Sequence, residues 1–84
     1  MRLYSVDVSN GQRKITHISD LRNRFNDESD YMVVLEMIEK DGFYNENPTL
    51  IVNIDFKAND QLLIDFISGV KRDVRKSYID EILK

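Results

Sequence analysis

Residues able to do acid–base or nucleophilic chemistry are few in this chain. His17 is the single histidine, and histidine is the side chain that most often exchanges a proton near neutral pH. No serine nucleophile motif accompanies it, and the lack of cysteine excludes a thiolate nucleophile or metal ligand. We therefore interpret His17 as a structural or surface residue, and we expect no catalytic residues and no enzyme activity.

Clustered acids are the next candidates, because hard cations bind oxygen ligands. Asp27, Glu28 and Asp30 are close in sequence, but the segment lacks the glycine and the distal glutamate of a calcium-binding loop. Helix capping and solvation explain these acids better. The three glycines are too far apart for a phosphate-binding loop. We expect no metal site and no cofactor.

One basic cluster could bind nucleic acid, because lysine and arginine displace the counterions of phosphates. Helical spacing places its residues side by side, next to an apolar stripe, where they could equally form a solvated face. The formal net charge of −3 argues against strong non-specific DNA binding. The cluster consists of Lys71, Arg72, Arg75 and Lys76.

Charge is distributed unevenly along the chain. Residues 1–25 carry five basic and two acidic residues, a net charge of +3. Residues 26–60 carry nine acidic and two basic residues, a net charge of −7, and residues 61–84 carry five basic and four acidic residues, a net charge of +1. A molecule of this kind can present an acidic patch to a basic partner or associate with itself.

Two adjacent aromatic residues, Phe43 and Tyr44, fall in the expected loop between residues 31–40 and 49–57. Aromatic side chains at a loop tip are costly in water and often mark a contact surface. They could also fold back over a thin core, because a chain of this length buries only about 60–65% of its unfolded surface. We keep Phe43 and Tyr44 as candidate partner-binding residues.

The elements that position these residues begin with a hairpin. Asn10-Gly11 lies between two alternating runs and favours a two-residue turn, because both residues tolerate positive φ. The register then pairs Val6 with Ile15 on one face, Asp7 with Lys14 on the other, and Tyr4 with His17. A short helix over 19–25 follows, with Ser19 or Asp20 as its cap.

Residues 31–40 fit two elements. In a strand, alternate residues from Tyr31 to Met37 share one face; in a helix, Val34 and Ile38 share one face, between an aspartate cap and a glycine stop. We favour the strand, because the chain then leads into a clear strand. The alternation favouring that next strand, over 49–57, is broken by Ile51 alone.

The last third of the chain has apolar residues at helical spacing from Leu63 to Tyr78, after a cap at Asn59 or Asp60. Ile79, Ile82 and Leu83 point away from this stripe on a helical wheel. One sheet face cannot cover both sets, so we expect these three residues to bind a partner or to form a homodimer.

The sequence predicts one small α+β domain over residues 1–84. Its parts are an antiparallel sheet of two β-hairpins (about 2–8/12–18 and 31–39/49–57), a short helix about 19–25, and a long C-terminal helix about 60–83 packed on one sheet face.

The segment with Asp41-Gly42, Pro48 and Ile51-Val52-Asn53-Ile54, followed by an amphipathic helix, is similar in layout to the single-stranded-DNA-binding transcriptional coactivators. The resemblance implies a sheet that binds single-stranded DNA. The basic strand residues of such a binder are missing here.

The expected function follows largely by elimination. We expect a non-enzymatic, cytoplasmic protein-binding module, since cysteine, a signal core and an apolar membrane span are all missing from the sequence. Its size suits a regulator, an inhibitor or an accessory protein, including one encoded by a phage or mobile element. The alternative is a single-stranded nucleic-acid-binding protein that uses the sheet face or the helix band 71–76.

Overall fold

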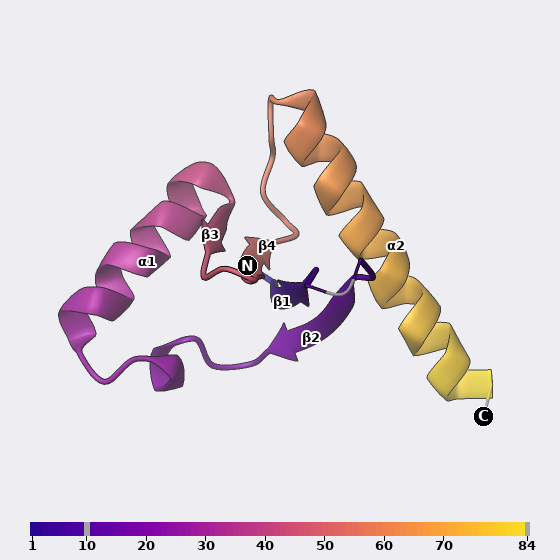
Figure 1. The fold of residues 1–84 in the computed structure, drawn as a ribbon, viewed down its shortest axis with the longest axis horizontal. Helices are drawn as coiled ribbons and strands as arrows, with labels where there is room; N and C mark the ends of the chain where they lie inside the picture. Colours follow the sequence, from indigo (N-terminus) through magenta and orange to yellow (C-terminus); the bar gives the residue numbers. More distant parts are fainter. Residues whose placement is uncertain (10, 84) are drawn as a thin grey trace.

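The computed structural model describes residues 1–9 and 11–83, with side chains as far as residue 76. A single four-stranded antiparallel sheet, in the order β2-β1-β4-β3, lies between two helices (Figure 1). The elements are β1 (Leu3–Asp7), β2 (Lys14–Ile18), the 3-10 helix η1 (Arg22–Arg24), α1 (Glu28–Asp41), β3 (Phe43–Asn45), β4 (Thr49–Asn53) and α2 (Gln61–Leu83).

The N-terminal hairpin has the predicted register. Val6 pairs with Ile15, and Asp7 pairs with Lys14. The N–H of Gly11 donates to the Val8 carbonyl oxygen at 3.2 Å, and Gly11 has a φ of 76°. Positive φ at this glycine agrees with the prediction, but the hydrogen bond joins residues 8 and 11, one position before the 9-to-12 bond that would close a two-residue turn at Asn10-Gly11. The other residue of the predicted turn, Asn10, lies outside the described residues.

The segment after the hairpin is helical, as predicted, but shorter. A 3-10 helix over Arg22–Arg24 replaces the predicted helix over 19–25. The N-cap is Leu21 rather than the predicted Ser19 or Asp20, although the Asp20 side chain accepts a hydrogen bond from the Arg22 N–H at 3.1 Å just before the helix. The side chain of Leu21 is buried in the apolar cluster that also contains Leu3 and Ile51, and this contact anchors the turn to the sheet.

The predicted strand over 31–39 is wrong, because these residues lie in helix α1. The Asp27 side chain accepts from the Ser29 N–H at 2.7 Å and caps the N-terminus. At the other end Gly42 is left-handed, with a φ of 88°, and its N–H donates to the Ile38 carbonyl oxygen at 2.9 Å. The capping residues at both ends and the burial of Val34 and Ile38 stabilise the helix over the predicted strand.

The second hairpin is therefore much shorter than predicted. Strand β3 begins directly after Gly42, and the turn at Asn47–Pro48, which contains a cis peptide bond, joins it to β4. The predicted strand over 49–57 ends at Asn53, where the backbone leaves the sheet. Ile51 broke the alternation because both faces of β4 are buried: Ile51 faces α1, whereas Val52 faces α2.

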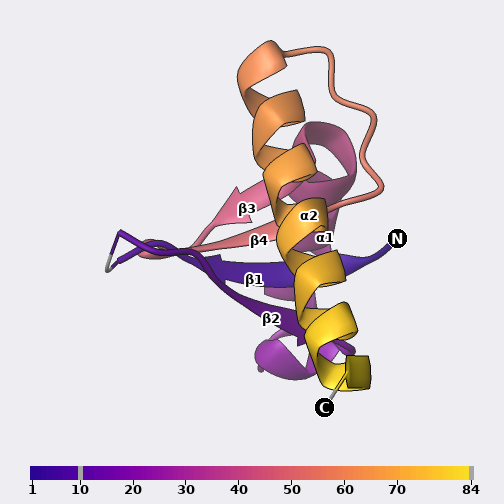
Figure 2. The same ribbon diagram turned by 90° about the vertical axis from the view of Figure 1, so that its right-hand side faces the viewer.

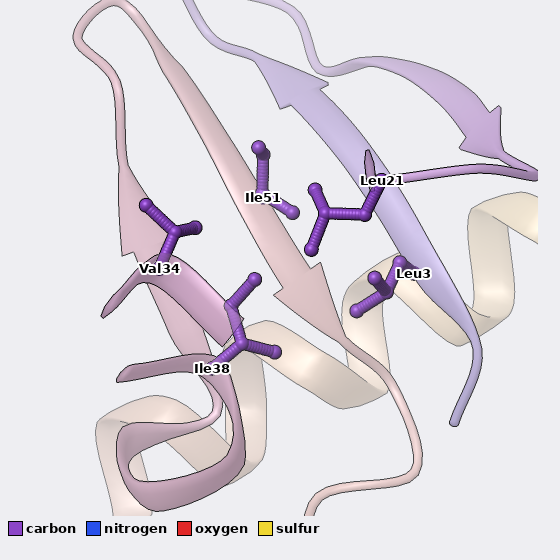
Figure 3. Close-up of a cluster of buried hydrophobic side chains, with 5 residues drawn as sticks. All are labelled: Leu3, Leu21, Val34, Ile38 and Ile51. Atoms are coloured by element: carbon purple, nitrogen blue, oxygen red, sulfur yellow. The ribbon is translucent and has the colours of Figure 1, made fainter. Parts of the chain in front are cut away.

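Two apolar clusters hold the three layers together. The first lies between the sheet and α1, where the side chains point toward one another (Figure 3): Leu3, Leu21, Val34, Ile38 and Ile51. The second lies between the sheet and α2, and it consists of Val6, Val52, Ile54, Ile67 and Val70. The predicted packing of the C-terminal helix on one sheet face is confirmed, and α1 occupies the face that the sequence interpretation left open.

Helix α2 crosses the strands and continues past β2, as the ribbon shows in two perpendicular views (Figures 1 and 2). Gly69 is buried where the Arg13 guanidinium lies against the helix. Arg13 Nε also pairs with the Asp73 carboxylate at 3.1 Å. The glycine inside this helix thus permits a close contact with the first hairpin.

An ion pair ties the N-terminus to the segment after β4. The Arg2 guanidinium pairs with the Asp55 carboxylate at 2.7 Å, and the Arg2 backbone N–H donates to the same carboxylate at 2.9 Å. The hydrogen bonds from Arg2 lower the pKa of Asp55 below its ordinary value of 3.8. Hydrogen bonds from Ser9 likewise lower the pKa of Asp7.

A lowered carboxyl pKa gives a defined dependence of stability on pH. The unfolded chain binds its proton first as the pH falls, so the contribution of Asp55 is full above about pH 4 and is lost as the pH falls through its folded pKa. We expect Asp55→Asn to reduce the difference in urea midpoint between pH 7 and pH 2. An unchanged difference would show that the ion pair does not contribute in solution.

Candidate protein-binding surface

Among the described residues, four of the eight large apolar side chains that the fold leaves exposed lie around one edge of the sheet. Strand β3 is the outermost strand on this side (Figure 2). Phe43, on the strand, is 37% exposed; Val33 and Met37, on α1, are 53% and 42% exposed; and Leu62, on α2, is 79% exposed. We call these four residues, together with Tyr44, the β3 edge surface.

On the α1 face of β3, the edge surface has a shallow groove of about 280 Å³. Val33 and Met37 are one helical turn apart and form a stripe beside the buried stripe of Val34 and Ile38. Tyr44 is half-buried and forms the sheet side of the groove. The remaining lining residues are Phe25 and Asp30.

On the α2 face, a second groove of about 230 Å³ lies between β3 and the first turns of α2. Phe43 and Leu50 line it from the sheet. The helix contributes Leu62, Leu63 and Phe66, with Asp60 at the rim. Apolar grooves therefore lie on both faces of the same short strand.

The structure corrects the placement of the two predicted aromatic residues. Phe43 and Tyr44 lie in a strand rather than at a loop tip, and as neighbours in a strand they point to opposite faces. Tyr44 contributes to the α1 groove and Phe43 to the α2 groove. Each of the two predicted contact residues therefore belongs to a different groove.

The outer edge of β3 carries backbone groups that do not face β4. The Gly42 carbonyl oxygen accepts from the Asn53 N–H at 2.8 Å, and the Glu46 N–H donates to the Thr49 carbonyl oxygen at 2.7 Å. Hydrogen-bonded residues alternate along an antiparallel strand, so Tyr44 also faces β4. The N–H and C=O groups of Phe43 and Asn45 consequently point outward.

The surroundings of the edge surface are acidic. Asp30 and Asp60 each line one of the two grooves, and Glu36 and Asp41 lie beside Val33 and Met37 on α1. Lys40 is the one cation among the residues that line these hollows. A further acid, Glu46, directly follows β3 and pairs with Arg24 at 3.0 Å. The arrangement favours an apolar ligand that carries positive charge.

The other candidates from the sequence lie elsewhere, apart from Asp30, which lines the α1 groove. His17 is exposed on β2 and contacts the Tyr4 ring edge-on, with 5.2 Å between ring centroids. Asp27 caps α1, and Glu28 and Asp30 lie in its first turn, where negative charge is favourable. Within the described residues, no group of three or more histidines, cysteines or acids could hold a metal ion.

The basic band of α2 is distant in sequence from β3 and is not part of the edge surface. Arg72, Arg75 and Lys76 are exposed, whereas Lys71 is half-buried in a hollow beside Phe56. Helices cover both faces of the sheet, but over β1 and β2 the α1 face has a polar hollow of about 390 Å³. The alternative of a nucleic-acid ligand on the sheet face or the helix band 71–76 stays a prediction.

The side chains of Ile79, Ile82 and Leu83 lie outside the described residues, so the predicted contact through them stays a prediction. In the part of the chain that the structure describes, no helix is both long and apolar enough to cross a bilayer.

No family model, curated protein or solved structure matches this chain. The layout that suggested the single-stranded-DNA-binding coactivators also changes, because α1 takes the place of the long strand before β4. A proposal for the function of this chain therefore rests on its own geometry.

Sequence reasoning missed Val33, Met37 and Leu62 as surface residues. The signal was available for the first two, because a helix over 31–40 places them one turn apart beside the core stripe. Leu62 carried no signal, since a single leucine in the first turn of an amphipathic helix is usually covered by the fold.

Proposed function

We propose that this chain is a non-enzymatic protein-binding module of the cytoplasm that acts as a regulator, an inhibitor or an accessory protein. Its β3 edge surface binds an apolar, basic segment of another protein. The observation that carries the proposal is the gathering of Val33, Met37, Phe43 and Leu62 on both sides of one free strand edge.

The energetic argument rests on burial. Fully covering a large apolar side chain that is otherwise in water contributes about 1.5–3 kcal/mol. Leu62, which is 79% exposed, can gain most of this value, whereas Val33, Met37 and Phe43 are already partly covered and can gain about half or less of it. Together the four side chains provide the apolar centre of the proposed interface, and the acids around them provide a charged rim. Charged rims raise the rate of association and discriminate against partners of the same sign.

The test compares variants of the edge surface with a matched control. Partners are trapped by cross-linking in the source cells, purified, and measured by calorimetry against the wild-type protein. We expect Met37→Glu and Phe43→Glu each to weaken binding at least tenfold, because the new carboxylate must lose its water opposite the apolar part of the ligand (about 1–3 kcal/mol or more).

Ile64→Glu is the control, since Ile64 is also 36% exposed but lines a different hollow of α2. Equal binding by the wild-type protein and the two edge variants would refute the proposed surface. A homodimer through Ile79, Ile82 and Leu83 stays part of the proposal, and sedimentation at micromolar concentration checks it.

A further inference from the structure

We infer that the ligand of the β3 edge surface binds as an added strand, antiparallel to β3, and that it carries three consecutive apolar residues between two flanking pairs of basic residues. This inference rests on the proposed function and states how that surface recognises its partner. It requires hydrogen bonds from the backbone of β3 as well as apolar contacts.

The backbone supplies the first part of the argument. Phe43 and Asn45 point their N–H and C=O groups outward, because Gly42 and Glu46 form the bonds to β4. Two residues with this orientation, two positions apart, can form two hydrogen-bonded pairs with an antiparallel segment. Four hydrogen bonds would then join the ligand to the sheet, and the strand order would become β2-β1-β4-β3-ligand.

The grooves supply the second part. The ligand residue opposite Tyr44 lies on the α1 face, where Val33 and Met37 line the groove. Its two neighbours lie on the α2 face, and the one opposite Phe43 lies toward Leu62. Three consecutive apolar residues therefore use both grooves, which a ligand lying on one face of the sheet cannot do.

Charge and length define the rest of the ligand. Asp41 and Asp60 lie beside the two grooves, so lysine or arginine residues suit the positions outside the apolar three. The Phe56 ring packs against Gly42 at the start of the strand, and the turn at Asn47 closes the other end. A second copy of this chain is disfavoured at the same edge, because it would bring its own acids against these.

The probe is the acetylated and amidated peptide Lys-Lys-Val-Leu-Val-Lys-Lys, with its leucine placed opposite Tyr44. We expect it to bind the 84-residue chain in an NMR titration, with the largest shifts at Phe43 and Asn45. N-methylation of the two valines removes the N–H groups that face β3, and we expect it to weaken binding about tenfold. N-methylation of the leucine, whose N–H faces away, is the matched control.

The protein offers a second, independent pair of variants. Asn45→Pro removes an outward N–H, a change that an edge strand tolerates. Asn45→Ala keeps this N–H but, like the proline variant, loses the side-chain acceptor of the Asn47 N–H. We expect the proline variant to bind the peptide about tenfold more weakly than the alanine variant.

The outcomes separate this inference from the proposed function. Loss of partner binding in Phe43→Glu, with equal peptide binding by Asn45→Pro and Asn45→Ala and by both N-methylated peptides, would overturn strand addition and leave the binding surface in place. No binding of the unmodified peptide at millimolar concentration would also overturn it. Should Asn45→Pro fail to fold, the comparison of the N-methylated peptides decides.

Discussion

Ile38→Ala is expected to lower the free energy of unfolding by about 2–5 kcal/mol, whereas Met37→Ala changes it by less than about 0.5 kcal/mol. Ile38 is fully buried between α1 and the sheet, and its truncation leaves a cavity beside Ile51. Met37, its neighbour in sequence, is 42% exposed in the free protein. Urea unfolding of the two variants gives both values.

The variants Ile38→Ala and Met37→Ala also distinguish a helix from a strand over residues 31–40. In a strand, Met37 would share the core face with Tyr31, and Ile38 would point to the other side. A larger loss for Met37→Ala than for Ile38→Ala would contradict helix α1. Because small domains are stable by only about 5–15 kcal/mol, the Ile38 variant is best measured at low temperature and low denaturant.

Gly42→Ala is expected to destabilise the protein more than Gly11→Ala, although both glycines have positive φ, 88° and 76°. The left-handed conformation costs an alanine about 1–2 kcal/mol at either position. At Gly11 the added methyl group has nothing within 4 Å, whereas at Gly42 it collides with the Phe56 ring. We expect a total loss of about 2–4 kcal/mol at Gly42 and about 1 kcal/mol at Gly11.

A double-mutant cycle isolates the collision. Phe56→Ala removes the ring, so Gly42→Ala in that background should cost only the backbone term, about as much as Gly11→Ala. Thermal or urea unfolding of the four proteins provides the cycle. Additive losses would show that the ring moves aside freely, and equal losses in Gly42→Ala and Gly11→Ala would show that it does not pack against this glycine.

The first hairpin could be predicted in detail because its signals are local. Asn10-Gly11 and the alternation on either side of it determine the register, and no distant contact is needed to pair Val6 with Ile15. The C-terminal helix was predictable for the same reason, since its apolar spacing extends over several turns. The predicted α+β class of the protein is confirmed.

The segment over 31–39 could not be assigned from its periodicity, because apolar residues occupy nearly every position and satisfy both periods. The caps at Asp27 and Gly42 were the better guide. Each provides a hydrogen-bond partner for a backbone N–H or C=O group at a helix end, and a strand has no such unpaired ends to cap. The same error concealed the β3 edge surface, because helix α1 is what places Val33 and Met37 beside Tyr44 of β3. The position of β3 at the sheet edge depends on the pairing of β1 with β4, which no local signal predicts.

The central place of β1 in the sheet has a consequence for how the chain folds. Leu3 pairs with Asn53, so β1, which precedes the other strands of the sheet in the chain, receives its second neighbour fifty positions later. The first hairpin can close within microseconds, yet the side chain of Val6 stays uncovered until β4 and α2 have arrived. Closing that long loop is expected to limit the rate, and the amides of β1, bonded on both sides, should be among the last to exchange with deuterium.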